Sequence, residues 1–518
     1  MNALTDEQKQ IREVGSENVK NGDNVAVIAF AGAGKTTTLT KLAEAIPSRG
    51  CYLAFNKAIA EEAKRKLVRT RCTASTMHSL AFGTIRDIID SPTTLNAKDF
   101  RGSGILAKVS FPRPRGWHDF RISGAVCRTV AAYCNSAAKE ISLEHAHEAI
   151  IQAVGDPDLI NNEEKAGQAQ AALDKLSGPI MEMAQLYWRD SIENGRFSHD
   201  VYLKLLDLDA DLRESAFRGF RYLMVDEAQD INPVQLSILQ KSGLPLVAVG
   251  DPYQQIYSWR GAENALDQIE GQRLFLTQSF RFGEDIAERA REILASRPDG
   301  GPTQHLIGAG RGIPPSYKGA RVAIICRTNA GMIDEAMRVM RTGKRIHIDN
   351  VEALVADVRS AEALQCGDMA RVTSQDIRQF DSWHELTAEA EESGGALARI
   401  VQIVEENRVS QVEGLMQSQS SHRDAEIMIC TAHRSKGLEF PGVSIGGDWQ
   451  EIGQMHRRFK SARGKSAKHV TLAVEAWNAL YVAATRSMVR LQGLDRVMRP
   501  EPDPEMEGHL PTEWEPID

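Results

Sequence analysis

The stretch Val25-Ala26-Val27-Ile28-Ala29-Phe30-Ala31-Gly32-Ala33-Gly34-Lys35-Thr36-Thr37 decides the fold of this chain. Its apolar run, Val25–Phe30, predicts a buried β-strand, and the glycines that follow predict a tight loop before a helix. Such a loop can wrap phosphate oxygens in backbone N–H groups, and the helix N-terminus adds partial positive charge. We therefore expect a nucleotide's phosphates to be bound by Ala31, Gly32, Ala33, Gly34, Lys35, Thr36 and Thr37. A glycine-rich turn without a ligand is the alternative.

A second apolar run, Tyr222–Val225, ends in the carboxylates Asp226 and Glu227. With Lys35 reaching the β- and γ-phosphates, we expect Thr36 and Asp226 to hold Mg²⁺ and Glu227 to orient the attacking water. By itself, an Asp-Glu pair after a strand is commonly just a pair of surface residues. Its position behind a phosphate loop favours hydrolysis of a nucleoside triphosphate.

Short apolar runs alternate with helical stretches in two separate blocks, which predicts an α/β fold with parallel sheets in two lobes. The first lobe is expected at 1–86 and 220–275, around a helical insertion at 87–219. The second lobe is expected at 276–333 and 422–498, around a reduced helical insertion at 334–421. In that insertion Ile377, Phe380 and Trp383 have the spacing of one helix face. The strands are expected at Val25–Phe30, Tyr52–Phe55, Tyr222–Val225, Leu246–Val249, Val322–Cys326, Ile427–Cys430 and Val443–Ile445.

The charge is concentrated at the end of the chain. The net charge is −8, and residues 499–518 hold seven acidic residues and one Arg, which leaves 61 basic against 63 acidic residues elsewhere. We expect 499–518 to be a disordered, acidic, Pro-rich tail, and the near-neutral remainder does not exclude a nucleic-acid groove.

No apolar run is long enough to span a bilayer, and no signal peptide is seen, so we expect a cytoplasmic, nucleoid-associated protein. None of the seven cysteines forms a C-x-x-C pair, which favours buried thiols over a zinc site.

Eight stretches in order resemble the motifs of superfamily 1 helicases of the UvrD/Rep/PcrA type. The residues Phe55-Asn56-Lys57 and Thr277-Gln278-Ser279-Phe280-Arg281-Phe282-Gly283 are most similar to the F-box DNA helicase branch and its bacterial and phage relatives. No F-box segment precedes Thr5, so that branch's ubiquitin-ligase role is not expected. The eight stretches are Thr5–Gln8, Phe55–Ala60, Thr76–Ser79, Asp226–Asp230, Gly250–Ala262, Gln278–Phe282, Thr431–Phe440 and Asn478–Arg486, and the phosphate loop Ala31–Thr37 lies between the first two.

The resemblance implies two RecA-like P-loop lobes with ATP between them. Gln8 would contact the adenine edge and Phe280 its face, and Gln254 would sense the γ-phosphate. Arg281 and Arg486 would be arginine fingers, groups worth roughly 10³–10⁵ in rate in comparable enzymes. Gly437 and Glu439 would contact the γ-phosphate region and the ribose.

The resemblance also implies a track for single-stranded DNA. Trp259 would stack on a base, and Arg260 would link the strand to the ATP site. Sequence-independent grip combines such aromatic platforms with phosphate contacts. The other DNA-binding residues would be Phe55, Asn56, Thr76, His78, Tyr257 and His433.

The function implied is an ATP-dependent 3′–5′ DNA helicase that acts as a monomer on single strands and duplex junctions in DNA repair or recombination. Two alternatives stay open. One is a translocase that clears proteins, such as a recombinase, from single strands with little unwinding. The other is a DNA-end-sensing ATPase subunit of a larger complex.

Overall fold

The computed structural model describes residues 4–86, 95, 97–114, 116–117, 119–157, 163–257, 264–378, 380–393, 395–449 and 467–498. By its internal contacts the chain divides into two compact units. Unit 1 consists of Met1–Ala29 and Gly34–Leu276, and unit 2 consists of Phe30–Ala33 and Thr277–Asp518. The expected tail at 499–518 lies outside the described residues.

Unit 1 is built on a six-stranded parallel sheet of order β3-β2-β4-β5-β1-β6. Four predicted strands form its interior, and two unpredicted strands, β3 and β6, form its edges. A parallel sheet needs helical crossovers, which explains the alternation of strands and helices in the sequence. The strands are β1 (Val25–Ala29), β2 (Gly50–Ala54), β3 (Cys72–Thr76), β4 (Tyr222–Asp226), β5 (Leu246–Gly250) and β6 (Gln272–Leu276).

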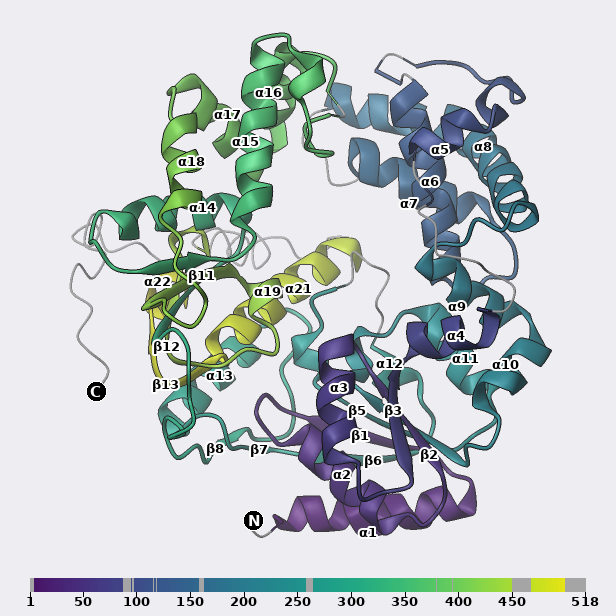
Figure 1. Cartoon of the computed structure of the whole chain (residues 1–518), viewed down its shortest axis with the longest axis vertical. Helices are drawn as coiled ribbons and strands as arrows, with labels where there is room; N and C mark the ends of the chain where they lie inside the picture. Colours follow the sequence, from purple (N-terminus) through teal and green to yellow (C-terminus); the bar gives the residue numbers. More distant parts are fainter. Residues whose placement is uncertain are drawn as a thin grey trace. The chain divides into compact units, whose positions relative to one another are not determined.

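The helices of unit 1 fall into two groups. Figure 1 shows α5 to α8 gathered away from the sheet, with α4 and α9 to α11 lying nearer to it. The described residues of the insertion expected at 87–219 are mostly helical. The helices are α1 (Asp6–Asn21), α2 (Lys35–Ala45), α3 (Lys57–Lys66), α4 (Met77–Ile85), α5 (Ala97–Gly102), η1 (Ile105–Ala107), α6 (Asp119–Asn135), α7 (Leu143–Val154), α8 (Glu163–Glu193), α9 (His199–Leu208), α10 (Ala210–Phe217), η2 (Ala228–Asp230), α11 (Pro233–Lys241), η3 (Pro252–Gln254) and α12 (Ala265–Gln268).

Unit 2 is built on a five-stranded parallel sheet of order β10-β11-β9-β12-β13. The three predicted strands are again interior, and the two edge strands were not predicted. A separate parallel pair joins β7 to β8. The strands are β7 (Gln278–Ser279), β8 (Ile307–Gly308), β9 (Val322–Cys326), β10 (Ile346–Ile348), β11 (Ile427–Thr431), β12 (Phe440–Ile445) and β13 (Ser487–Gln492).

The helices between β10 and β11 form a compact group with α14 (Figure 1). One expectation here was wrong: Ile377 and Phe380 do not share a helix with Trp383, which begins α16. Both residues lie in a non-helical connection, although their side chains are buried in the same core. The spacing of these three residues in the sequence therefore reflects packing of their side chains in one core, and not a shared helix. The helices are α13 (Glu284–Ala295), α14 (Asn329–Met340), α15 (Val351–Gln365), η5 (Met369–Arg371), α16 (Trp383–Ser393), α17 (Gly395–Glu405), α18 (Val409–Gln417), α19 (Ala432–Ser435), η6 (Gly447–Trp449), α21 (Ala467–Ala484) and α22 (Leu494–Met498).

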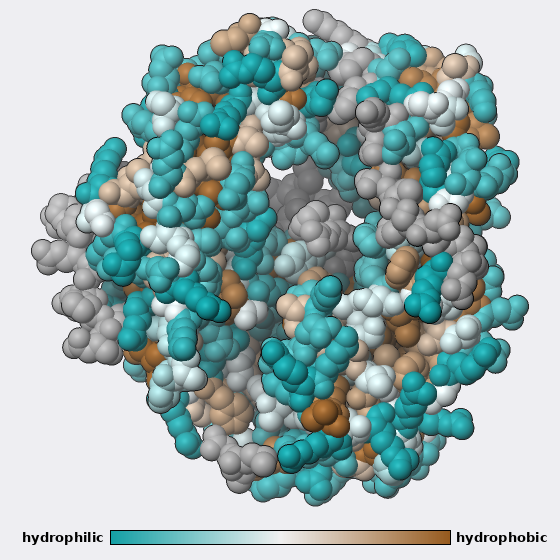
Figure 2. Space-filling view, viewed as in Figure 1, coloured by the Kyte–Doolittle hydropathy of each residue, from teal (hydrophilic) through white to brown (hydrophobic). Residues whose placement is uncertain are grey.

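The surface is mainly hydrophilic in the view of Figure 2, where hydrophobic residues occur as scattered small patches. Among the described residues, every helix is too short or too polar to cross a membrane.

The thiols of Cys51, Cys72, Cys134, Cys326 and Cys430 are buried, as predicted. Cys127 is half-buried and Cys366 is exposed.

Candidate active site

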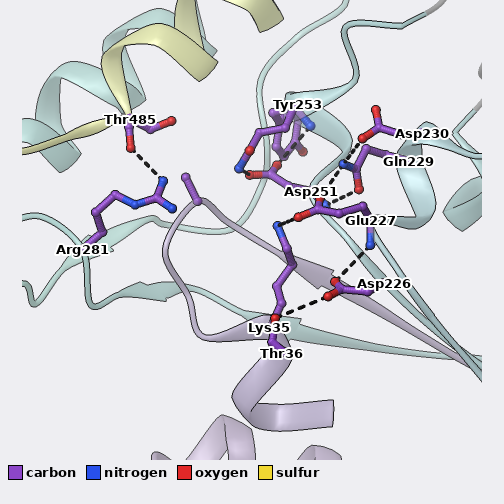
Figure 3. Close-up of polar contacts among 12 residues, drawn as sticks. Lys35, Thr36, Asp226, Glu227, Gln229, Asp230, Asp251, Tyr253, Arg281 and Thr485 are labelled. Carbon is purple, nitrogen blue, oxygen red and sulfur yellow. Dashed lines mark hydrogen bonds and ion pairs between the residues drawn. The ribbon is translucent and has the colours of Figure 1, made fainter. Parts of the chain in front are cut away.

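The start of α2, directly after the phosphate loop, and the end of β4 meet in unit 1. Gly34 adopts a left-handed conformation (φ 79°, ψ 32°) and caps α2, whose first residues are Lys35 and Thr36. The Lys35 Nζ lies 3.3 Å from Glu227 Oε1, and the Thr36 hydroxyl donates to Asp226 Oδ2 at 3.3 Å. Figure 3 shows these four side chains pointing toward one another. The structure therefore brings together the lysine, hydroxyl and carboxylates that the sequence predicted as a catalytic set.

The charged groups of this cluster lie close enough to shift one another's pKa. Burial alone would lower the pKa of Lys35, but the nearby carboxylates of Glu227, Asp251 and Asp226 outweigh it and raise that pKa. Burial raises the pKa of Asp226, and the negative charge of Glu227 adds to the effect. Burial also raises the pKa of Asp251. One lysine thus stands among three acidic groups, an excess of negative charge that suits a divalent cation.

Glu227 is held in an unusual backbone conformation. Its φ of 54° and ψ of 44° lie in the left-handed region, which is uncommon for a residue other than glycine, and such residues cluster at functional sites. The backbone N–H of Glu227 donates to Asp226 Oδ1 at 3.0 Å. This turn directs the Glu227 side chain toward Lys35 rather than along the strand.

Gln229, which the sequence analysis did not single out, holds Glu227 from the other side. Its Nε2 donates to Glu227 Oε2 at 2.7 Å and to Asp230 Oδ2 at 3.1 Å. Its Oε1 accepts the Asp251 backbone N–H at 2.9 Å. A Cβ at Gly250 would lie only 2.3 Å from that Oε1, so a side chain there would displace the Gln229 amide. Gln229 thereby connects Glu227 to the loop after β5.

A Gln229→Met variant, which keeps the length of the side chain without its polar atoms, is expected to lower the ATPase turnover number. Hydrogen bonds to charged groups contribute about 1.5–3 kcal/mol, which corresponds to roughly 10- to 100-fold in rate. Nucleotide affinity should change little, because Gln229 contacts Glu227 rather than the phosphate loop. Steady-state ATPase assays test this against Gln240→Met on α11, where the glutamine is exposed. Equal turnover by the two variants would contradict the assigned role.

Gln254 is also buried in this network. Its Nε2 donates to Asp251 Oδ2 at 2.7 Å, and Asp251 Oδ1 accepts the Tyr253 backbone N–H at 3.1 Å. The residue predicted to sense the γ-phosphate is thus tied to the same loop that Gln229 contacts.

Two predicted site residues also have clear local roles. Gln8 forms a capping box with Thr5 at the start of α1, and its Nε2 donates to Thr38 Oγ1 at 3.3 Å. The Thr76 hydroxyl caps α4 by accepting the Ser79 N–H at 3.1 Å. Contact of Gln8 with adenine and of Thr76 with DNA remain predictions.

The predicted arginines of unit 2 have different surroundings. Arg281 donates through Nε to Glu439 Oε1 at 2.8 Å and through Nη1 to the Thr485 carbonyl at 2.9 Å. Arg486 is only 1% exposed. Its Nε donates to the Val482 carbonyl at 2.9 Å and its Nη1 to the Leu438 carbonyl at 3.4 Å. A finger role for Arg486 remains a prediction.

The remaining nucleotide-site predictions also lie in unit 2. Phe280 is 43% exposed, and its backbone N–H donates to the Gly32 carbonyl at 2.9 Å. A Cβ at Gly32 would lie 2.6 Å from Ser279 Oγ, and Gly32 has a φ of 72°, so this position requires glycine. Gly437 also has a positive φ, of 86°. Ala31 and Ala33 are buried in the same segment.

Two residues that were predicted to bind DNA, Phe55 and Tyr257, lie against each other in unit 1. The ring of Phe55, which follows β2, stacks on Tyr257 with centroids 5.7 Å apart and planes 20° apart. Phe55 remains 37% exposed, and Asn56 beside it caps α3. His78 is half-buried, with its Nε2 3.8 Å from Asp200 Oδ1. Trp259 and Arg260 lie outside the described residues, and His433 is half-buried on α19 of unit 2.

The oxygen groups near Lys35 fit Mg²⁺ bound together with a nucleotide. Thr36 and Asp226 offer hard oxygen ligands, and Mg²⁺ commonly takes one or two carboxylates together with phosphate oxygens and water. Within the described ranges, no cluster of three or more His, Cys, Asp or Glu could hold a metal by itself. The oxygen groups of Thr36 and Asp226 therefore suit a cation that also binds the phosphates of a nucleotide.

Comparison with known proteins identifies two family domains in this chain. The UvrD/REP helicase N-terminal domain matches residues 9–269, and the UvrD-like helicase C-terminal domain matches residues 147–492. F-box DNA helicase 1 of Gallus gallus is 28% identical over 93% of this chain and 48% of its own length. F-box DNA helicase protein 1 of Schizosaccharomyces pombe is 27% identical over 94% of this chain and 57% of its length. DNA helicase IV of Escherichia coli is 25% identical over 54% of this chain and 46% of its length.

The chain thus spans about half the length of the curated relatives it matches. The two matched domains together cover both parallel sheets and the residues around Lys35 and Arg281. They imply that the two sheets are those of RecA-like lobes. This chain therefore belongs to the UvrD/REP helicase family.

Proposed function

We propose that this chain hydrolyses ATP with Mg²⁺ and uses the energy to move 3′ to 5′ along single-stranded DNA and to separate duplex. Lys35 and the loop Ala31–Thr37 hold the phosphates, and Glu227 orients the attacking water. Thr36 and Asp226 would hold Mg²⁺, which neutralises charge on the phosphates when bound. From unit 2, Arg281 and Arg486 would stabilise the charge that develops on the transferred phosphoryl group.

The observation that carries this proposal is the convergence of Lys35, Thr36, Asp226 and Glu227 at the phosphate loop. A loop of this kind alone would indicate only nucleotide binding. The carboxylate held at Lys35 by Gln229 adds a group that can orient water, which is what hydrolysis requires.

The stacked pair Phe55 and Tyr257 supports the DNA part of the proposal. An exposed aromatic ring offers a sequence-independent platform for a base, and base–aromatic stacking is worth about 1–3 kcal/mol per base. Asn56 lies next to Phe55, and Trp259 and Arg260 follow Tyr257 closely in the chain. We assign these residues, with Thr76, His78 and His433, to binding a single strand or a junction.

The test combines ATPase and unwinding assays. ATPase activity should be stimulated by single-stranded DNA and fall as salt increases, because phosphate contacts release counterions. Duplexes carrying a 3′ tail should be separated and those carrying a 5′ tail should not. Unwinding from 5′ tails alone would contradict the polarity, and no stimulation by single-stranded DNA would contradict the motor itself.

A second candidate is a translocase that removes bound proteins from single strands in repair or recombination. One observation favours it: the helical segment between β10 and β11 is short, comprising α15 to α18. Robust DNA-stimulated ATPase with displacement of a recombinase filament, but without strand separation, would select this candidate over the first.

A further inference from the structure

Tyr52 is a buried tyrosine beside the proposed metal ligands. It lies on β2 with its side chain 0% exposed. The parallel register pairs Tyr52 with Met224 of β4, so Asp226 is two residues further along the same face. A long aromatic side chain can bridge such a diagonal separation. The strand register therefore places the phenol of Tyr52 next to the C-terminal end of β4.

The Tyr52 hydroxyl meets a carboxylate whose two oxygens are both engaged. It donates to Asp226 Oδ2, the same oxygen that accepts the Thr36 hydroxyl at 3.3 Å. Asp226 Oδ1 accepts the Glu227 backbone N–H at 3.0 Å. These three donors fix the orientation of the carboxylate about its own axis, with Oδ2 on the side of Thr36.

The phenol is suited to this role because it remains a donor. A tyrosine hydroxyl carries its proton at neutral pH and can therefore donate to the carboxylate. A buried carboxylate is unfavourable unless it is hydrogen-bonded or paired. Phenylalanine would fill the same space but would leave Oδ2 with one donor fewer.

We propose that Tyr52 is a positioning residue that holds Asp226 Oδ2 beside Thr36, so that both oxygen ligands face the same divalent cation. The inference rests on the proposed Mg²⁺–nucleotide function and adds a residue that acts through Asp226 without touching the nucleotide. Groups of this kind orient ligands, and losing one typically weakens metal binding by about 10- to 100-fold.

The test compares Tyr52→Phe with Tyr222→Phe in the full chain. Tyr222 is equally buried on the neighbouring strand, and among the described residues its hydroxyl makes no hydrogen bond to a carboxylate. Mn²⁺, which takes similar oxygen ligands, is titrated in the presence of ADP and followed by its electron paramagnetic resonance signal. Binding of a fluorescent ADP in EDTA and the thermal midpoint are measured in parallel.

We expect Tyr52→Phe to raise the Mn²⁺ dissociation constant by about 10- to 100-fold while metal-free ADP binding and the thermal midpoint stay near wild type. Tyr222→Phe should match wild type in all three. If wild type takes up no Mn²⁺ with ADP, the proposed function itself fails. If wild type binds Mn²⁺ and Tyr52→Phe binds it equally well, the positioning role is overturned. Loss of metal-free ADP binding or a large drop in thermal midpoint would assign Tyr52 to the fold, which also overturns it.

Discussion

A Glu227→Gln variant is expected to bind ATP with near-normal affinity and to hydrolyse it at least about 100-fold more slowly. Groups that accept or orient a proton in the transition state typically contribute 10²–10⁴-fold. The amide keeps an acceptor for the Gln229 Nε2, which lies 2.7 Å from Glu227 Oε2, so the local fold should survive. It cannot take a proton or attract one as a carboxylate does.

Single-turnover ATPase assays and binding of a fluorescent ATP analogue measure the two effects separately. The matched control is Glu44→Gln on α2, where the glutamate pairs with Lys41 far along the helix from the phosphate loop. Binding of single-stranded DNA should survive in both variants. Turnover within a few fold of wild type for Glu227→Gln would show that another group orients the water.

A Lys35→Ala variant is expected to lose ATP binding as well as turnover. The lysine supplies the positive charge that faces Asp226, Glu227 and Asp251, and without it those carboxylates would repel a triphosphate. A single charge-assisted hydrogen bond contributes about 1.5–3 kcal/mol, so losing several such contacts to phosphate should weaken ATP binding by at least about 100-fold. The variant should still bind single-stranded DNA.

Equilibrium titration with a fluorescent ATP analogue measures this loss. Lys41→Ala, on the same helix but paired with Glu44, controls for removal of a lysine from α2. An ATP affinity of Lys35→Ala close to that of Lys41→Ala would remove Lys35 from the phosphate site. A parallel loss of DNA binding would point to general unfolding and would contradict the separation of the two sites.

The strands show where sequence reading succeeds and where it stops. Every strand predicted from an apolar run lies in the interior of its sheet, where both faces are buried and the run is nearly continuous. The strands missed in the two larger sheets, β3, β6, β10 and β13, are all edge strands. An edge strand such as β6 has exposed polar residues, here Gln272 and Arg273, so its sequence lacks a continuous apolar run.

The residues around the phosphate loop also fall into two groups: those that local sequence marks and those that it does not. Lys35, Thr36, Asp226 and Glu227 were predictable because each stands at a strand end or helix start that local sequence marks. Gln229 and Tyr52 were not, because their roles depend on contacts across strands. Tyr52 acts through its register against β4, and Gln229 acts through the close approach of Gly250.

The sequence by itself determined the α/β class, the interior strands, the phosphate loop and the order of the family motifs. These follow from local hydrophobicity, glycine positions and spacing, which act over a few residues. Only the tertiary structure decided which side chains hold the carboxylates of Asp226 and Glu227, that Phe55 stacks on Tyr257, and that Arg486 is buried against backbone carbonyls. Those outcomes depend on strand order and register, which bring together residues far apart in the chain, and no local pattern specifies them.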